Sequence, residues 1–295
     1  MNNAPKISIG MPVFNGELYI ADAIESVLNQ TFSDLELIIS DNASSDTTQE
    51  ICEAYAKKDN RIRYIRQSKN VGAAGNFNYT FEVAKGEYFA WLAHDDLIKE
   101  KYLEACLKVL EHNDSVVLCF SKTKFIDEHG EFICDYEYSA EVQDDDTTKR
   151  FVEMISASHI VVEVFGLIRS DILAKSKKIA SFMTSDFVLL SELLLYGKFY
   201  ELPDYLFYHR EHKDRSVKAC ADPKDREKWF DTSKDVKFVF PWWRRLFEHA
   251  KVVIRTPLSM KLKIKLLGAV LKVVYWRKSV LLDDVLNALR TQRAS

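Results

Sequence analysis

A single stretch, residues 88–96, constrains the fold more strongly than any other part of this chain. It begins with six apolar residues and continues through His94 into the adjacent carboxylates Asp95 and Asp96. A continuous apolar run of this length is typical of a strand buried on both faces of a parallel sheet. The carboxylates would then lie at the carboxyl edge of the sheet, where open α/β folds bind ligands. They could hold a divalent metal that carries a diphosphate, or form a solvated acidic turn.

Strand-like and helical segments alternate through the first 115 residues or so. Strands are predicted at residues 7–14, 35–40, 62–67 and 88–93, and amphipathic helical segments lie between them and after the last. This alternation predicts an α/β fold with a Rossmann-like, mostly parallel sheet and right-handed crossovers. Residues 1–115 are therefore interpreted as a nucleotide-binding half.

The second half of the chain is less regular. An apolar strand is predicted at 116–126 and a strand-like run at 161–169. A helix at 183–196 is followed by two short strands, 199–202 and 205–208, on either side of a Pro-Asp pair. We expect residues 116–220 to complete a catalytic domain spanning residues 1–220, and residues 221–295 to form a helical appendage broken at two prolines.

Charge is unevenly distributed along the chain. The net charge is −3, which gives no indication of nucleic-acid binding. From residue 244 onward, however, there are 12 Lys and Arg against three Asp and Glu. Lys261, Lys265 and Lys272 share one face of a predicted helix whose other face is apolar. Such a helix indicates peripheral contact with an anionic membrane; the alternative is that its apolar stripe packs on the catalytic body or on a second subunit.

Three absences set the expected location. The first residues are mostly polar and lead directly into a strand, so no signal peptide is predicted. No apolar stretch reaches the roughly 18 residues of a membrane-spanning helix. The five cysteines show no CxxC pair or metal-like spacing. We therefore expect a cytoplasmic protein, peripheral on the inner face of the membrane if the basic helices bind there.

Polar side chains recur just after predicted strands or at the start of a helix. Asp41 could accept hydrogen bonds from a ribose or a base, or it could form an Asx turn. Asp95 and Asp96 are the metal candidates. Asp186 begins the helix at 183–196, where a carboxylate is either an N-cap or a general base.

Several motifs, taken in order, resemble family 2 glycosyltransferases over roughly residues 6–125, with a weaker match to about residue 216. The motifs are Ile7–Asn15, Ser26–Thr31, Glu36–Thr47, Asn70–Gly72, Ala84–Tyr88 and the Asp95-Asp96 pair. The resemblance implies a GT-A fold, usually inverting chemistry, a nucleotide-sugar donor that is most often UDP-linked, and Mg²⁺ or Mn²⁺ as cofactor.

By position, the resemblance assigns most of the donor site. Pro12, Val13, Phe14 and Asn15 correspond to the loop that holds the base and ribose, and Asp41 to the base-binding aspartate. Asn70 and Gly72 belong to a further donor-binding motif, and Asp96 would lie near the donor sugar or the acceptor. His212, in the late Tyr/Arg/His segment 208–212, is the best match for a contact with the metal or the phosphates; a satisfied or solvated histidine is the alternative.

The catalytic and metal positions depart from the family pattern. Asp95 matches the last acid of the Asp-x-Asp motif that contacts the metal, but Ala93 stands where the first acid would be. Asp186 matches the catalytic base of a Glu-Asp pair, with Ser185 replacing the Glu. Ala93 and Ser185 keep open an alternative: a catalytically degenerate module that binds nucleotide sugars or serves in assembly.

The acceptor implied by the family and the basic tail is a glycan or a lipid-linked glycan in surface-polysaccharide assembly. A sugar-phosphate nucleotidyltransferase would share the nucleotide-binding architecture. It would need a Gly-rich, Arg-containing loop after the first strand, and the sequence Pro-Val-Phe-Asn-Gly at 12–16 lacks it.

Overall fold

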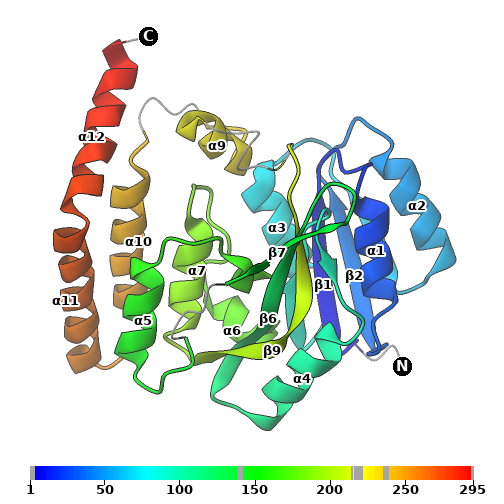
Figure 1. The fold of residues 1–295 in the computed structure, drawn as a ribbon, viewed down its shortest axis with the longest axis horizontal. Coiled ribbons are helices and arrows are strands. Elements are labelled where there is room, and N and C mark those ends of the chain that lie inside the picture. The colour runs from blue at the N-terminus through cyan, green and yellow to red at the C-terminus, as the bar shows by residue number, and fades with distance from the viewer. Residues whose placement is uncertain (1–3, 138–141, 214, 216–221, 235–238, 294–295) are drawn as a thin grey trace.

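A nine-stranded mixed sheet forms the centre of the molecule, with helices on both of its faces (Figure 1). The computed structural model describes residues 4–137, 142–213, 215, 222–234 and 239–293. Eight strands lie in the order β3-β2-β1-β4-β8-β6-β9-β5, and β7 pairs with β6. Their bounds are β1 Ile7–Val13, β2 Leu35–Asp41, β3 Ile62–Arg66, β4 Tyr88–Trp91, β5 Leu97–Ile98, β6 Val116–Ile126, β7 Phe132–Tyr136, β8 Leu167–Arg169 and β9 Lys198–Arg210.

The first four strands are parallel, as predicted. The chain runs outward from β1 through β2 to β3 and then returns to place β4 on the other side of β1. The strand order therefore reverses beside β1, and a crevice at the carboxyl ends of the strands is expected there. Connecting and following helices are α1 Ile20–Leu28, α2 Thr48–Lys58, α3 Gly72–Glu82 and α4 Tyr102–His112.

Strand β4 confirms the prediction of a strand buried on both faces. Tyr88 and Ala90 join the core cluster that includes residues of α1 and α4. Phe89 and Trp91 point the opposite way, into the cluster shared with α3 and helix α7, Ser185–Leu193. Because successive strand residues face opposite sides, an apolar run without alternation requires cover on both.

Two predictions for the second half were wrong. The predicted strand at 161–169 is a 3-10 turn, Val162–Phe165, followed by the short β8. The two short strands predicted at 199–208 form one long strand, β9, paired with β6. In that ladder Ser121 lies opposite Leu202 and Lys122 opposite Tyr205, so the Pro-Asp pair forms a bulge. Proline has no N–H to donate, and a bulge accommodates it without ending the strand.

Helices from the second half form a further layer beyond α7 (Figure 1). As predicted, the prolines delimit them: Pro241 is the first residue of α10, and α10 ends before Pro257. The bounds are α5 Thr147–Ser156, α6 Ser170–Lys175, α9 Pro223–Phe230, α10 Pro241–Arg255, α11 Met260–Trp276 and α12 Lys278–Arg293. No helix in the described ranges is long and apolar enough to cross a bilayer.

The apolar residues of α11 divide into two sets. Leu266, Val270 and Val273 are buried in the cluster shared with α5 and α10. Ile264 and Leu271 are 68% and 69% exposed. Packing against α5 and α10 therefore accounts for one side of the helix and leaves an apolar strip of the other side at the surface.

Candidate active site

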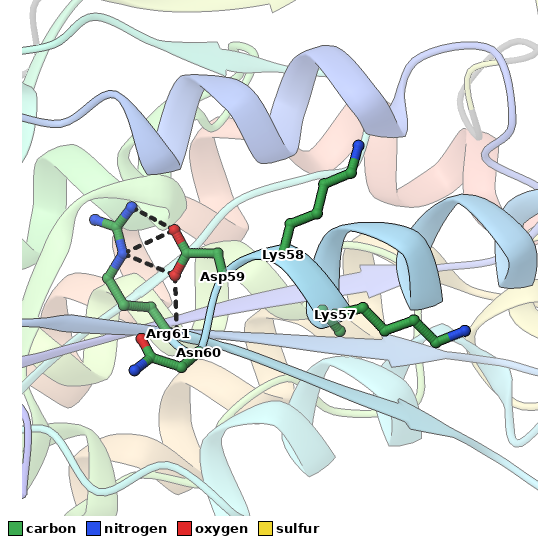
Figure 2. Close-up of a pocket in the computed structure, with 6 residues that line it drawn as sticks. Lys57, Lys58, Asp59, Asn60 and Arg61 are labelled. Atoms are coloured by element: carbon green, nitrogen blue, oxygen red, sulfur yellow. Dashed lines mark hydrogen bonds and ion pairs between the residues drawn. The ribbon is translucent and has the colours of Figure 1, made fainter.

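The cavity at the end of α2 is not associated with the predicted site. It measures about 520 Å³ and is lined by residues 56–61, from the last turn of α2 to the residue before β3. It therefore lies at the amino edge of the parallel strands. Figure 2 shows Arg61 directed onto Asp59, with 2.8 Å between Nη2 and Oδ2. This ion pair closes the turn, and the predicted functional residues lie at the opposite edge.

The first predicted donor loop leaves the carboxyl end of β1. Pro12 and Val13 are buried in the strand. Phe14, just beyond the strand, is 45% exposed. Asn15 has a φ of 52°. The left-handed region is uncommon for residues other than glycine, and such conformations concentrate at ligand sites.

Hydrogen bonds join this loop to the loop after β2. The Asn15 N–H donates to Ser44 Oγ at 2.9 Å, and the Ser45 N–H donates to Asn15 Oδ1 at 2.9 Å. The Gly16 N–H donates to Thr48 Oγ1 at 2.8 Å. The two loops therefore form one rigid edge of the crevice.

Asp41 ends β2 and is fully buried. Its carboxylate accepts hydrogen bonds from the Ser44 N–H at 2.8 Å, the Tyr64 hydroxyl at 2.7 Å and the Arg66 guanidinium at 2.7 Å. These bonds fix the turn after β2 and hold a cationic group beside it. Contact between Asp41 and the base of a nucleotide remains a prediction. It would use the lone pairs of the carboxylate oxygens that these three hydrogen bonds do not occupy.

A third loop, after β3, is held by side-chain amides. Asn42 donates to Asn70 Oδ1 at 3.0 Å and accepts from the Val71 N–H at 2.8 Å, while the Gly72 N–H donates to Asn70 Oδ1 at 2.9 Å. Gly72 has a φ of +80°, and a Cβ there would lie 2.5 Å from the backbone oxygen of Phe230. Only glycine satisfies both constraints. Asn70 and Gly72 thus shape the loop and permit α9 to pack against it.

Asp95 follows β4 and faces a histidine from the end of β9. Its Oδ2 lies 2.9 Å from His212 Nε2, and the Asp95 side chain is 17% exposed. Burial raises the pKa of Asp95, but nearby His94 and the hydrogen bond from His212 outweigh it, so the pKa lies below the ordinary value. A carboxylate oxygen and an imidazole nitrogen at this separation are a donor pair that one divalent ion accepts.

Asp96 fastens β9 to the turn after β4. It is 1% exposed, and its Oδ1 accepts from the Arg210 N–H at 2.9 Å and lies 2.9 Å from His209 Nδ1. The Arg210 guanidinium donates to the Asp95 carbonyl at 3.0 Å and to Asp22 at 3.1 Å. The other oxygen of Asp96, Oδ2, is buried with no hydrogen-bond partner in the described residues. That oxygen is the atom left for the predicted contact with the donor.

The predicted base, Asp186, lies in the first turn of α7. Its side chain is half-buried, and burial raises its pKa above the ordinary carboxyl value. The positive charges of Arg245 and Arg226 act in the opposite direction. Thr184, the residue before the helix, has a φ of 72°, which is strained for a β-branched side chain. A carboxylate of raised pKa beside a strained turn is typical of functional sites.

Helix α9 links the two parts of the site. The hydroxyl of Thr232, just after α9, donates to the Asn70 carbonyl at 3.0 Å on the donor side. Glu227 accepts from the Met183 N–H at 2.9 Å on the side of the base. Arg226 lies on the same helix, and its Nε is buried with no partner in the part of the chain described. The charge of Arg226 acts on both Asp186 and Arg215, and Arg215 in turn lies near Asp95 and Asp96.

Sequence reasoning assigned no role to three residues that organise this site. Asn42 was part of a recognised motif, and its side-chain bonds appear only once the loops after β2 and β3 meet. Arg210 lies in the recognised Tyr/Arg/His segment, but its burial depends on the pairing of β9 with β5 and β6. Arg226 lies outside every motif that was recognised, and its proximity to Asp186 follows from how α9 packs.

Comparison with known proteins places the chain in a family. Residues 8–176 match the family described as glycosyl transferase family 2. An uncharacterized glycosyltransferase, MJ1057 of Methanocaldococcus jannaschii, is 32% identical over 175 residues, which are 59% of each chain. Glycosyltransferase GlyG of Streptococcus pneumoniae is 33% identical over 126 residues, 43% of this chain and 42% of that protein. The match thus spans about half the length of these relatives.

Solved structures share the fold at low sequence identity. TarS of S. aureus, residues 1–349 in complex with UDP-GlcNAc, has a TM-score of 0.68 at 16% identity, covering 97% of this chain and 81% of that one. The mannosyltransferase PcManGT of Pyrobaculum calidifontis, in complex with GDP-Man and Mn²⁺, has a TM-score of 0.54 at 14% identity, covering 94% and 76%. The predicted GT-A fold is confirmed, and with a family match over more than half of its length, the chain belongs to glycosyl transferase family 2.

Proposed function

We propose that this glycosyltransferase moves a sugar, with inversion, from a nucleotide-diphosphate sugar to a hydroxyl group of a glycan or lipid-linked glycan acceptor. The observation that carries the proposal is the arrangement around α9, which contacts the donor loop at Asn70 and the base loop at Met183. A UDP-linked donor is supported by TarS, whose structure contains UDP-GlcNAc. A role in surface-polysaccharide assembly is part of the same proposal.

In the proposed reaction the residues of this chain act in one step, a displacement at the anomeric carbon of the donor sugar. The oxygen of the acceptor hydroxyl forms a bond to the anomeric carbon, and Asp186 accepts the proton of that hydroxyl. The bond between that carbon and the diphosphate oxygen breaks on the opposite face, and the nucleoside diphosphate leaves with the electron pair. Arg215, whose charge is felt by Asp95 and Asp96, would supply positive charge that stabilises the leaving group. One displacement with one base inverts the anomeric centre.

A divalent metal, Mn²⁺ or Mg²⁺, fits this account. No group of three or more His, Cys, Asp or Glu side chains suited to a metal occurs in the described ranges. The chain would supply Asp95 and His212, and the other ligands would come from diphosphate oxygens and water, as is usual for Mg²⁺. When bound, the ion supplies Lewis-acid stabilisation of the leaving diphosphate. The Mn²⁺ in PcManGT supports this assignment.

Replacing Arg226 by glutamine is expected to move the acidic limb of the pH profile of kcat/KM to higher pH. Arg226 favours the ionised form of Asp186, so its loss raises the pKa of Asp186 further. A base must be ionised to act, so activity is lost at a higher pH than in the wild type. We also expect kcat/KM at neutral pH to fall roughly tenfold.

Lys228→Gln is the matched control, since it removes a charge from an exposed position of the same helix. Its pH profile should coincide with that of the wild type. If the profile of Arg226→Gln also coincides with that of the wild type, Arg226 does not act on the base.

We further propose that the exposed strip of α11 contacts an anionic membrane surface, on the cytoplasmic side of the membrane. Met260, Ile264, Leu271 and Tyr275 are each at least 68% exposed, and their spacing puts them on one side of the helix. Lys261 and Lys272 are exposed on the same helix. Apolar side chains with flanking lysines match the chemistry of an anionic interface.

The double variant Ile264→Glu/Leu271→Glu is expected to bind vesicles containing phosphatidylglycerol at least roughly tenfold more weakly. Each such side chain contributes about 1.5–3 kcal/mol when buried, and the added charges are repelled. Sedimentation with vesicles measures the effect. Phe132→Glu, at a residue 58% exposed on β7, is the control. Equal retention of both variants would refute membrane contact through α11.

A further inference from the structure

A second cavity lies between the segment leading into α7 and helix α10. Its volume is about 390 Å³, within the usual range for ligand pockets. Its lining includes two carboxylates, Glu192 and Glu248, against five cationic side chains. The cationic residues are Lys177, Lys178, Arg244, Lys251 and Arg255. The excess of three positive charges indicates that the cavity takes an anionic ligand.

Ion pairs within the protein account for part of this charge. Arg255 Nε donates to the buried Glu192 at 2.8 Å, and Lys251 Nζ lies 2.9 Å from Glu248. Arg244 is 3.3 Å from Glu227, which is not among the lining residues. Lys177 and Lys178 form no ion pair within the described ranges, but Lys178 Nζ lies over the Phe81 ring, 5.7 Å from its centre and outside the cavity lining. Lys177, from the segment before α7, is thus the lining cation with neither an ion pair nor an aromatic partner among the described residues.

Ser185 lines the cavity and directly precedes the proposed base, Asp186, which is not among the lining residues. Ser185 is 1% exposed, and its hydroxyl oxygen is buried with no hydrogen-bond partner among the residues described. A buried hydroxyl group of this kind usually bonds to something, whether protein, water or ligand. A ligand in this cavity would therefore supply the missing partner of the Ser185 hydroxyl group, one residue before the proposed base.

We propose that this cavity binds a phosphate group of the acceptor. The inference rests on the proposed function, because it takes Asp186 as the base that receives the acceptor's proton. The donor loops lie at the ends of β1, β2 and β3 and do not line this cavity, so the donor diphosphate does not account for the charge. Lysine and arginine together are the usual ligands of phosphate in proteins. The space beyond one phosphate group accommodates the adjoining sugar or polyol unit.

The test uses inorganic phosphate and glycerol phosphate as soluble probes, with binding measured by calorimetry. The variant Lys177→Glu/Lys251→Glu reverses two charges of the lining at exposed positions. Lys261→Glu/Lys272→Glu is the matched control, since both lysines are exposed on α11, outside the cavity. We expect the first variant to bind the probes at least roughly tenfold more weakly and the control to bind them as the wild type does. Lys177→Arg/Lys251→Arg should retain binding.

A second arm distinguishes a soluble phosphate from one held in a lipid. If vesicles of phosphatidylglycerol compete with glycerol phosphate in the wild type and not in the charge-reversed variant, the cavity takes the phosphate of a lipid-linked acceptor. If only the soluble probes bind, the cavity takes the phosphate group of a soluble polymer. Unchanged phosphate binding in Lys177→Glu/Lys251→Glu overturns the proposal. Failure of the proposed function is separate: wild type would then not bind any nucleotide sugar, whatever the phosphate result.

Discussion

Asp186→Asn is expected to reduce kcat roughly 10²- to 10⁴-fold, the usual contribution of a general base. The substitution keeps the shape of the side chain but removes the proton acceptor. Donor binding should be unchanged, because the proposal assigns Asp186 to the acceptor rather than to the donor. Single-turnover transfer from a nucleotide sugar, together with calorimetric titration of the donor, measures the two quantities separately.

The same variant is expected to unfold at a temperature equal to or above that of the wild type. Burial raises the pKa of Asp186 in the folded protein, so ionisation of this carboxyl group costs stability once pH rises above its unfolded pKa of about 3.9. A neutral asparagine removes that cost at pH 7. The acidic limb of the wild-type activity should lie above the ordinary carboxyl pKa for the same reason.

Asp171→Asn is the matched control, since its side chain is 69% exposed on α6. It should change neither transfer nor thermal stability measurably. A stable Asp186→Asn protein with wild-type activity would show that the base is another residue. If the Asp186→Asn protein fails to fold, the expectation that loss of this charge does not destabilise the folded state is wrong.

Asp95→Asn is expected to abolish the dependence of donor binding on Mn²⁺ and to lower kcat/KM roughly 10²- to 10³-fold. The substitution removes the charge that faces His212 at 2.9 Å and leaves a weak ligand for a hard cation. In the wild type, a chelator should remove activity, and Mn²⁺ should restore it. In the variant, added Mn²⁺ should restore little.

Asp114→Asn, at a fully exposed aspartate near the start of β6, serves as the control for Asp95. It should respond to chelator and Mn²⁺ as the wild type does. If Asp95→Asn keeps a metal response equal to that of the control, the metal is held elsewhere, or the reaction needs none.

Local pattern was sufficient to predict the parallel half of the fold. The apolar run at 88–93 has no alternation, and burial of β4 on both faces is what that pattern requires. Strand lengths in the second half depended on pairing. Pro203 and Asp204 interrupt the pattern between two apolar runs, yet the ladder with β6 continues past them through a bulge. A bulge depends on the partner strand and cannot be predicted from one strand alone.

The residues of the candidate site divide in the same way, into those that local sequence pattern predicts and those that depend on how distant segments pair. Motif positions selected Asp95 and Asp186 as candidates, because each lies at the end or the start of an element that periodicity predicts. The partners of Asp41 could not be predicted in this way: Tyr64 and Arg66 come from the neighbouring strand, more than 20 residues away, and meet Asp41 only through the register of β2 and β3. Arg226 was missed because a short polar helix carries no signal of where it packs.

The most direct test of the central claim is calorimetric titration of the purified protein with a panel of nucleotide sugars, with and without Mn²⁺. The account predicts saturable binding of one nucleotide sugar, strengthened by Mn²⁺ in the wild type and not in Asp95→Asn. Lack of binding to every member of the panel by a folded protein would contradict it. That result would favour the alternative of a catalytically degenerate assembly module.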